Sequence, residues 1–317
     1  GLSSQSLYFY EIDPAIESSL EEILLGLSES QKMIPPKYFY DERGSELFME
    51  ITRQPEYYLT RTEISLLQRY ADEMTAQIGE DCLLIEYGSG SSEKIRILLE
   101  SLRPRAYAPL DISREYLVVA AGALALEFPW LEIHATCLDF TADFELPFAM
   151  DAKRVAFFPG SSIGNFNRTD ASEFLGRVRR LVGKQGGMLI GVDLKKDPTL
   201  LDAAYNDANG INESFNLNIL NHLNEKFDAD FVVSEFQHVA EYEADNGCVA
   251  MYLRSVVNQE VDIAGTQIKF TAGELIHTEN SHKYFVDEFV DMAREAGFNK
   301  HKLWTDENKW FGVFYLY

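Results

Sequence analysis

The middle of the chain alternates short apolar runs with amphipathic stretches. Five runs of four to six mostly apolar residues predict buried strands at Leu83–Tyr87, Ala106–Leu110, Glu132–Cys137, Val155–Phe158 and Met188–Val192. Apolar residues recur at helical spacing between them, which predicts helices through Ile95–Leu99, Tyr116–Leu126 and Phe174–Val178. Strands that alternate with helices favour a parallel sheet covered on both faces.

The residues before this alternating region follow two other patterns. A first helix is expected to begin at the capping pair Asp13-Pro14 and to carry an apolar stripe of Ile16, Leu20, Ile23, Leu24 and Leu27. The segment Ile34–Thr60 is rich in tyrosine and proline and has no clear period. We interpret it as a rigid lid whose hydroxyls point inward; a segment docked on the surface is the alternative.

After Leu194 the alternation stops. A helical region is expected from Leu200 to about Phe227, followed by strands at Phe236–Tyr242, Val249–Val257 and Val261–Phe270. The pair Asn246-Gly247 predicts a hairpin turn between the first two of these strands. The chain ends with an amphipathic helix and a hairpin, at Phe285–Ala296, Lys302–Trp304 and Trp310–Tyr317. The pattern therefore predicts a parallel α/β sheet extended by an antiparallel hairpin, with residues 196–283 inserted near the edge of the sheet.

Charge and composition narrow the choice of partners. The 51 acidic and 28 basic residues give a net charge of −23, which repels nucleic acid and anionic membranes but suits a cationic cofactor or a small zwitterion. The chain has no run of 18 apolar residues and no leader pattern at its start. The three cysteines are far apart, as is typical of buried thiols in a reducing compartment. We expect a cytoplasmic monomer.

Three strand ends carry signals for a nucleoside. Gly88-Ser89-Gly90 follows the first strand, where glycines let the backbone turn tightly and approach a ligand. Glu93 stands where a dinucleotide site needs a third glycine, which weakens a nicotinamide oxidoreductase interpretation. Asp111 ends the second strand, as expected of a ribose ligand, and Asp139-Phe140 follows the third. Each feature alone fits an ordinary turn or helix cap, but together they favour nucleoside binding.

The sequence gives little indication of a metal site or of a catalytic cysteine. The six histidines form no pair at metal-ligand spacing, and no cysteine has a partner motif for nucleophilic catalysis. We therefore expect no metal. The segment from Phe158 to Phe166, FPGSSIGNF, ends the fourth strand and is the second candidate for a functional loop beside the lid.

Eight blocks of sequence carry a resemblance to a known family. They are PPKYFYDERGSELF, ITRQPEYYLTRTE, GSGSSEK, PGSSIGNF, DLKKD, AYNDANG, FNLNIL and TENSHK, in order from about residue 33 to the C-terminus. This set resembles the histidine Nα-methyltransferases of ergothioneine biosynthesis. The sequence departs from the family pattern at Leu59, Ser162, Asn280 and His282, none of which has an assigned role.

The resemblance implies a fold, a cofactor and a set of contacts. The fold would be α/β, with a Rossmann-like class I methyltransferase sheet and C-terminal antiparallel hairpin in residues 61–195 and 284–317. A second α+β domain, residues 8–60 and 196–283, would bind substrate. S-adenosylmethionine would contact Gly88, Gly90, Lys94, Asp111, Asp139 and Phe140. A histidine substrate would meet Asn165 and Tyr205 with its amine and carboxylate, Tyr57, Glu279 and Ser281 with its imidazole, and Met251 on the pocket wall, with Tyr40 nearby.

The expected reaction is methylation of the α-amino group of free histidine, continuing to the trimethylated betaine hercynine. Tyr40, Tyr57 and Asn165 are the expected catalytic residues, and the general base is left open among Tyr40, Tyr57 and Glu279. Two alternatives remain: an enzyme of the same build acting on another amino acid or small amine, and a cofactor-binding module without turnover.

Overall fold

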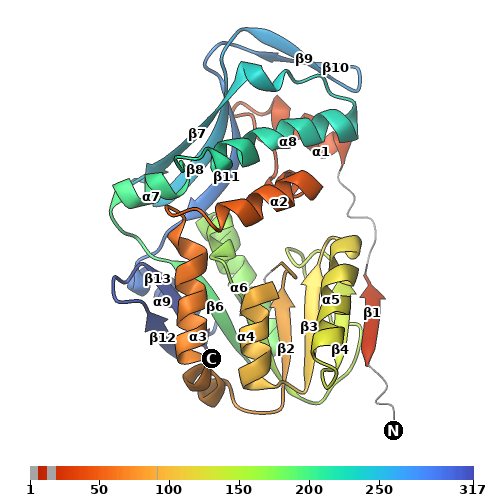
Figure 1. Ribbon diagram of the computed structural model, residues 1–317, viewed down its shortest axis with the longest axis vertical. Coiled ribbons are helices and arrows are strands. Elements are labelled where there is room, and N and C mark those ends of the chain that lie inside the picture. Colours follow the sequence, from red (N-terminus) through yellow and green to blue (C-terminus); the bar gives the residue numbers. More distant parts are fainter. Residues whose placement is uncertain (1–5, 13–18, 91) are drawn as a thin grey trace. The chain divides into compact units, whose positions relative to one another are not determined.

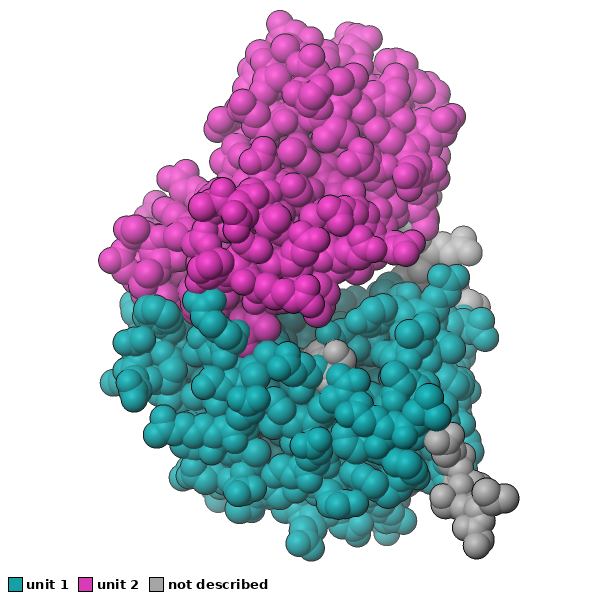
Figure 2. Space-filling view, viewed as in Figure 1, with its two compact units in different colours: residues 1–17, 61–194, 284–317 teal, residues 18–60, 195–283 magenta. Residues whose placement is uncertain are grey.

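The computed structural model describes residues 6–12, 19–90 and 92–317 of the chain. The chain forms two compact units, which Figure 2 shows in different colours. Unit 1 consists of residues 1–17, 61–194 and 284–317, and unit 2 consists of residues 18–60 and 195–283. Within the described ranges, no helix combines the length and apolar character needed to cross a membrane.

The described part of unit 1 contains one eight-stranded sheet, in the order β1-β4-β3-β2-β5-β6-β13-β12. Its parallel core is β4 (Ile133–Cys137), β3 (Ala106–Asp111), β2 (Cys82–Tyr87), β5 (Lys153–Phe158) and β6 (Gly187–Asp193). The C-terminal hairpin of β12 (His301–Thr305) and β13 (Phe311–Leu316) joins antiparallel to β6. The expected α/β sheet with its terminal hairpin is therefore confirmed.

Helices cover both faces of this sheet. Figure 1 shows α3 (Tyr58–Ile78), α4 (Ser92–Leu102) and α5 (Arg114–Glu127) on the near face. The other two, α6 (Arg168–Val182) and α9 (Val286–Glu295), contact each other, and α6 packs on β5 and β6. Every residue of β2 and β6 is buried, which explains why their sequences are apolar without alternation.

The N-terminal strand corrects one expectation. We expected residues 8–60 to belong with the substrate-binding half, but β1 (Leu7–Glu11) pairs in parallel with β4 in unit 1. Pairing with β1 satisfies backbone groups that β4 would otherwise expose as an edge strand. The expected cap Asp13-Pro14 and Ile16 lie outside the described residues. The described helix α1 (Leu20–Ser28) begins after Ser19, whose side chain accepts a hydrogen bond from the Glu22 amide.

Unit 2 is built around an antiparallel sheet. In the described residues this sheet has the order β11-β8-β7, formed by β11 (Leu275–His282), β8 (Cys248–Ser255) and β7 (Phe236–Glu243). Helix α8 (Ile211–Phe227) packs on β7 and β8, and α2 (Glu42–Ile51) and the short helix η1 (Pro36–Phe39) pack on α8 (Figure 1). Most of the tyrosine-rich segment is thus helical and contributes to the core of unit 2.

Two stretches of unit 2 that were each predicted as one element form two elements in the structure. The helical region after Leu200 consists of α7 (Pro198–Ala204) and α8, because Asp207 accepts hydrogen bonds from the Ile211 and Asn212 amides and starts a new helix. The expected strand Val261–Phe270 is a hairpin of β9 (Gln259–Ile263) and β10 (Thr266–Phe270). Ala264 and Gly265 have φ angles of 49° and 94°, which turn the chain between them.

Candidate active site

The glycine loop after β2 is tied to the end of β3. Gly88 has a φ of 92°, a conformation that favours glycine, and its amide donates to the Leu110 carbonyl at 2.8 Å. One Asp111 carboxylate oxygen accepts from the Ser89 amide at 3.1 Å and the Ser89 hydroxyl at 2.7 Å. The other accepts from the Ser113 amide at 2.9 Å. The expected cofactor residues Gly88 and Asp111 are therefore held together, and Gly90 follows in the same loop.

Asp139 and Phe140 lie two and three residues beyond the end of β4. The Asp139 Oδ1 atom accepts from the Thr141 amide at 2.9 Å and the Thr141 hydroxyl at 2.5 Å. Its Oδ2 atom has no hydrogen-bond partner among the described residues. The half-buried Phe140 ring packs edge-on against Tyr87, with centroids 5.4 Å apart.

These residues fit the nucleoside part of S-adenosylmethionine. A ribose needs acceptors for its hydroxyls, and an adenine needs an acceptor for its amino group and an apolar surface for its ring. Asp111 and Asp139 offer the acceptors, and Phe140 offers the surface. The glycine at residue 88 has no heavy atom within 4 Å of where a Cβ would lie, so the loop is open on that side.

Lys94 is held by a carboxylate that the sequence did not single out. Its ammonium lies 2.7 Å from Glu63 Oε1, and the Glu63 side chain is only 1% exposed. Glu63 also accepts from the Gly160 amide with both oxygens, at 2.8 and 3.1 Å. A Cβ on Gly191 would lie 1.9 Å from Glu63 Oε2, so only glycine leaves room for this carboxylate. Lys94 and Glu63 together fix the start of the loop after β5.

That loop carries Asn165. Gly160 has a φ of 81° and Ser161 a φ of 54°, which is an unusual conformation for serine. The Ser161 hydroxyl accepts from the Asp193 amide at 2.8 Å and so holds this conformation. The short helix η2 (Ser162–Asn165) follows, and Asn165 is exposed at its end, with no side-chain hydrogen bond to any described residue. Its amide is thus available to a ligand.

Unit 2 holds a second polar cluster, centred on Tyr205 and Ser281. Their hydroxyl oxygens lie 2.9 Å apart. The Lys283 ammonium donates to the Tyr205 hydroxyl at 2.7 Å and to the Ser281 hydroxyl at 3.0 Å. Lys283 is fully buried, and Tyr205 and Ser281 are 6% and 8% exposed. The three groups form a closed triangle, which we call the Lys283 triangle.

Three more expected substrate residues lie near this triangle. The ring of Tyr57 packs edge-on to that of Tyr205, with centroids 6.0 Å apart. Burial raises the pKa of Glu279 to about 7, and the charge of Lys283 opposes this rise. Burial raises the pKa of Tyr40 well above 10, and the negative charge of Glu279 adds to the effect. Tyr40 nevertheless keeps 47% of its surface exposed.

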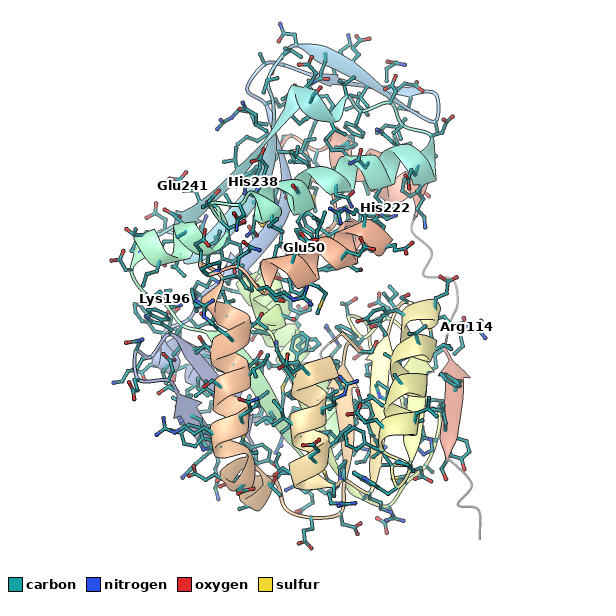
Figure 3. All side chains as sticks on the ribbon, viewed as in Figure 1. Glu50, Arg114, Lys196, His222, His238 and Glu241 are labelled. Carbon is teal, nitrogen blue, oxygen red and sulfur yellow. The ribbon has the colours of Figure 1, made fainter. Side chains whose placement is uncertain are left out.

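Met251 and His238 support the cluster from the sheet. Met251 on β8 is 2% exposed and pairs in register with Glu279 on β11. His238, labelled in Figure 3, lies on β7 and hydrogen-bonds through Nε2 to the Tyr205 carbonyl at 3.0 Å. Its Nδ1 atom lies 2.8 Å from the Asn216 amide nitrogen. Burial lowers the pKa of His238, which keeps the ring neutral and able to accept from Asn216.

The tyrosines of the Ile34–Thr60 segment divide into two kinds. Tyr38 donates to Glu22 at 2.9 Å and accepts from the Ser19 amide, and the hydroxyl of Tyr58 accepts from Lys196 at 2.6 Å. These contacts hold unit 2 together. Tyr40 and Tyr57, in contrast, belong to the cluster around Glu279.

Sequence patterns did not indicate Glu63, His238 or Lys283. All three make contacts with residues distant in the chain. The only signal was that Glu63 and Lys283 end two of the blocks that resemble the family, ITRQPEYYLTRTE and TENSHK.

Known proteins with similar sequences identify the family. The model of a family described as histidine-specific, S-adenosylmethionine-dependent methyltransferases matches residues 19–317. The chain is 38% identical over 308 residues to the histidine N-alpha-methyltransferase of Mycolicibacterium smegmatis, covering 95% of each chain. It is 37% identical over 299 residues to the protein of the same name from Mycobacterium tuberculosis, covering 92% of each. It is also 32% identical over 313 residues to ergothioneine biosynthesis protein 1 of Neurospora crassa, covering 93% of this chain and 35% of that one.

The match explains the strand-end signals of unit 1 and confirms the resemblance drawn from the sequence blocks. S-adenosylmethionine is the cofactor. The chain belongs to the family of histidine-specific, S-adenosylmethionine-dependent methyltransferases.

Proposed function

We propose that this protein transfers methyl groups to the α-amino nitrogen of free histidine and continues to the trimethylated betaine. The observation that carries the proposal is the cluster of Tyr205, Glu279 and Ser281 in unit 2. The names of the two bacterial relatives support the same substrate.

The cluster suits an imidazole because it offers both kinds of hydrogen-bonding group. A neutral imidazole has one N–H donor and one nitrogen acceptor. Glu279 accepts when ionised and donates when protonated, and a pKa of about 7 makes both forms accessible near neutral pH. The Ser281 hydroxyl, whose oxygen accepts from Lys283, can donate to the other nitrogen. Phenylalanine and leucine would leave these buried groups unpaired, which is the strongest way to reject an analogue.

The α-amino and carboxylate groups need a different set of partners. We assign the carboxylate to Tyr205 and the amine to Asn165, whose amide offers an acceptor and two donors. When bound, S-adenosylmethionine supplies a methyl group activated by its positive sulfur. The task of the protein is therefore to hold a neutral amine with its lone pair free. The amide oxygen of Asn165 accepts an N–H of that amine and so orients it.

The raised pKa values bear on the choice of base. The pKa of Tyr40 lies well above 10, so its hydroxyl stays protonated at neutral pH and acts in hydrogen bonding. Glu279 has a pKa of about 7, the value suited to accepting a proton near neutral pH. The raised pKa of Tyr40 therefore argues against Tyr40 as the base that deprotonates the amine. The rings of Tyr40 and Tyr57 would suit the cationic trimethylammonium product through cation–π contacts.

Titration calorimetry tests the proposal. Histidine, phenylalanine and tryptophan would each be titrated into the protein with S-adenosylhomocysteine present. We expect a binding signal for histidine and none for phenylalanine, because sites that pair polar groups reject analogues lacking them by as much as ~10⁴-fold. Glu279→Ala should weaken histidine binding and leave S-adenosylhomocysteine binding intact. Equal affinity for phenylalanine and histidine would overturn the assignment of the cluster.

A further inference from the structure

Lys283 has no role in the function proposed above, yet it lies in the middle of the substrate cluster. It directly follows β11, and its side chain is fully buried. A buried ammonium is costly unless its charge and its donors are compensated. Two of its three donors are directed at hydroxyl oxygens, those of Tyr205 and Ser281, and its nitrogen lies 4.9 Å from the centre of the Tyr205 ring. Such a placement calls for an explanation beyond packing.

Lys283 restricts the directions in which the hydroxyl protons of Tyr205 and Ser281 can point. An ammonium has only donors, so the oxygens of Tyr205 and Ser281 must both accept from it. Neither hydroxyl proton can point back at Lys283. One of the two protons can lie between the hydroxyl oxygens, which are 2.9 Å apart. At least one proton is therefore directed away from the triangle, as a donor, with a positive charge directly behind it.

A donor backed by a fixed charge is complementary to an anionic acceptor. In a histidine substrate that acceptor is the carboxylate, which we assigned to Tyr205. The same charge disfavours an ammonium group beside the triangle and thus favours the orientation in which the carboxylate meets Tyr205. Burial strengthens both effects, because charges interact more strongly when water is excluded.

We propose that Lys283 is a positioning and specificity residue: it fixes the hydroxyls of Tyr205 and Ser281 as donors and selects substrates that carry a carboxylate. The proposal rests on the proposed function, because it takes histidine as the substrate. Lys283 would then be the residue that distinguishes histidine from histidinol, the amino alcohol that lacks the carboxylate.

The test compares histidine with histidinol, which has a hydroxymethyl group in place of the carboxylate. Affinities would be measured by calorimetry with S-adenosylhomocysteine present, for the unmodified protein and for Lys283→Met and Lys283→Gln. Lys269→Met is the matched control, because Lys269 is 82% exposed on β10 of the same unit. Thermal melting and S-adenosylhomocysteine affinity establish that each variant is folded, and the polar Gln variant carries the test if the Met variant does not fold.

We expect Lys283→Met to weaken histidine binding by about 10- to 100-fold, as for the loss of hydrogen bonds from a charged donor. Histidinol binding should change less than about threefold, so the preference for the carboxylate collapses. Lys269→Met should leave both affinities unchanged. Equal weakening of both ligands would show a merely structural role and overturn the proposal, as would no change in either.

A double-mutant cycle provides a second readout. If Lys283 acts through the two hydroxyls, Lys283→Met should have much less effect in a Tyr205→Phe/Ser281→Ala background. An equal effect in both backgrounds would overturn the proposal. The two failures are distinguishable: an unmodified protein that does not bind histidine refutes the proposed function, whereas one that binds histidine but keeps its preference in Lys283→Met refutes only the role of Lys283.

Discussion

Glu279 is subject to two opposing influences at the scale of a single side chain. Burial disfavours its charged form, and the positive charge of Lys283 favours it. The net result is a pKa of about 7, above the ordinary value of a glutamate carboxyl group. The Glu279 side chain therefore changes its protonation near neutral pH.

This shift predicts a pH dependence of stability. Between the ordinary pKa of 4.5 and about 7, the folded protein keeps the Glu279 proton that the unfolded chain has lost, so stability falls as pH rises. Glu279→Gln removes this effect. We expect the variant to gain stability over the unmodified protein by up to about 3 kcal/mol above pH 7, and nothing at about pH 4. Urea unfolding at both pH values measures it; an equal difference at both would contradict the raised pKa.

Asn165 allows a test of the proposed contact with the substrate amine. Because its exposed amide has no partner among the described residues, Asn165→Ala should leave the fold intact. We expect turnover of histidine to fall by about 100-fold, the cost of misplacing a reacting group, while S-adenosylhomocysteine affinity persists. Asn308→Ala, at an exposed position in the β12–β13 turn, is the matched control and should retain full turnover. Unchanged turnover in Asn165→Ala would remove that residue from the site.

The residues that sequence patterns found differ in kind from those that they missed. Gly88 and Asp111 follow strands that are themselves recognisable, so their position at the sheet edge could be predicted. Glu63 reaches a partner 97 residues away, and Lys283 one 78 residues away. No local pattern encodes such contacts, because they exist only once the chain has folded. Their place in blocks shared with a family was the only available signal.

At the scale of elements, the strands that were predicted correctly are those that are buried along most of their length. The core strands of unit 1 are buried along nearly their whole length and appear in the sequence as apolar runs. Strand β1 is a partly exposed edge strand of five residues, LYFYE, and was not predicted as a strand. The turn at Ala264-Gly265 was missed because apolar residues recur at alternate positions both before and after it, so that β9 and β10 were predicted as one strand.

The loop after β5 depends on a contact between elements. A methyl group at residue 191 in β6 would lie 1.9 Å from Glu63 Oε2, so Gly191→Ala must displace the carboxylate that binds Gly160 and Lys94. We expect a loss of about 1–3 kcal/mol in the free energy of unfolding, as for other overpacked cores, together with reduced turnover.

Gly122→Ala in α5 is the control for this substitution. A Cβ at residue 122 would meet no heavy atom within 4 Å, so alanine should stabilise the helix by about 0.5–1 kcal/mol. Urea unfolding of the two variants measures the contrast. If Gly191→Ala were as stable as Gly122→Ala, the close approach of Glu63 to β6 would be wrong.

At the scale of the whole molecule, each unit is assembled from separate segments of the chain. Residues 61–194 and 284–317 build one continuous sheet around a break of 89 residues, and those 89 residues fold with residues 18–60. The pattern after Leu194 indicated the insertion because alternation of strands and helices stops there. Segments that fold together across such breaks are difficult to pair from sequence, which is why β1 was placed in the wrong unit.

The net charge of −23 also acts on the whole molecule. It is compatible with a positively charged cofactor and a zwitterionic substrate, neither of which requires a basic surface. The proposed reaction thus agrees with the residues of each cluster and with the charge of the chain.

Mass spectrometry of histidine incubated with the protein and S-adenosylmethionine tests the central claim most directly. The account predicts products that carry one, two and finally three added methyl groups, all located on the α-nitrogen by fragmentation, with the Asn308→Ala control behaving identically. Histidine that gains no mass, or a methyl group found on the imidazole ring, would contradict it.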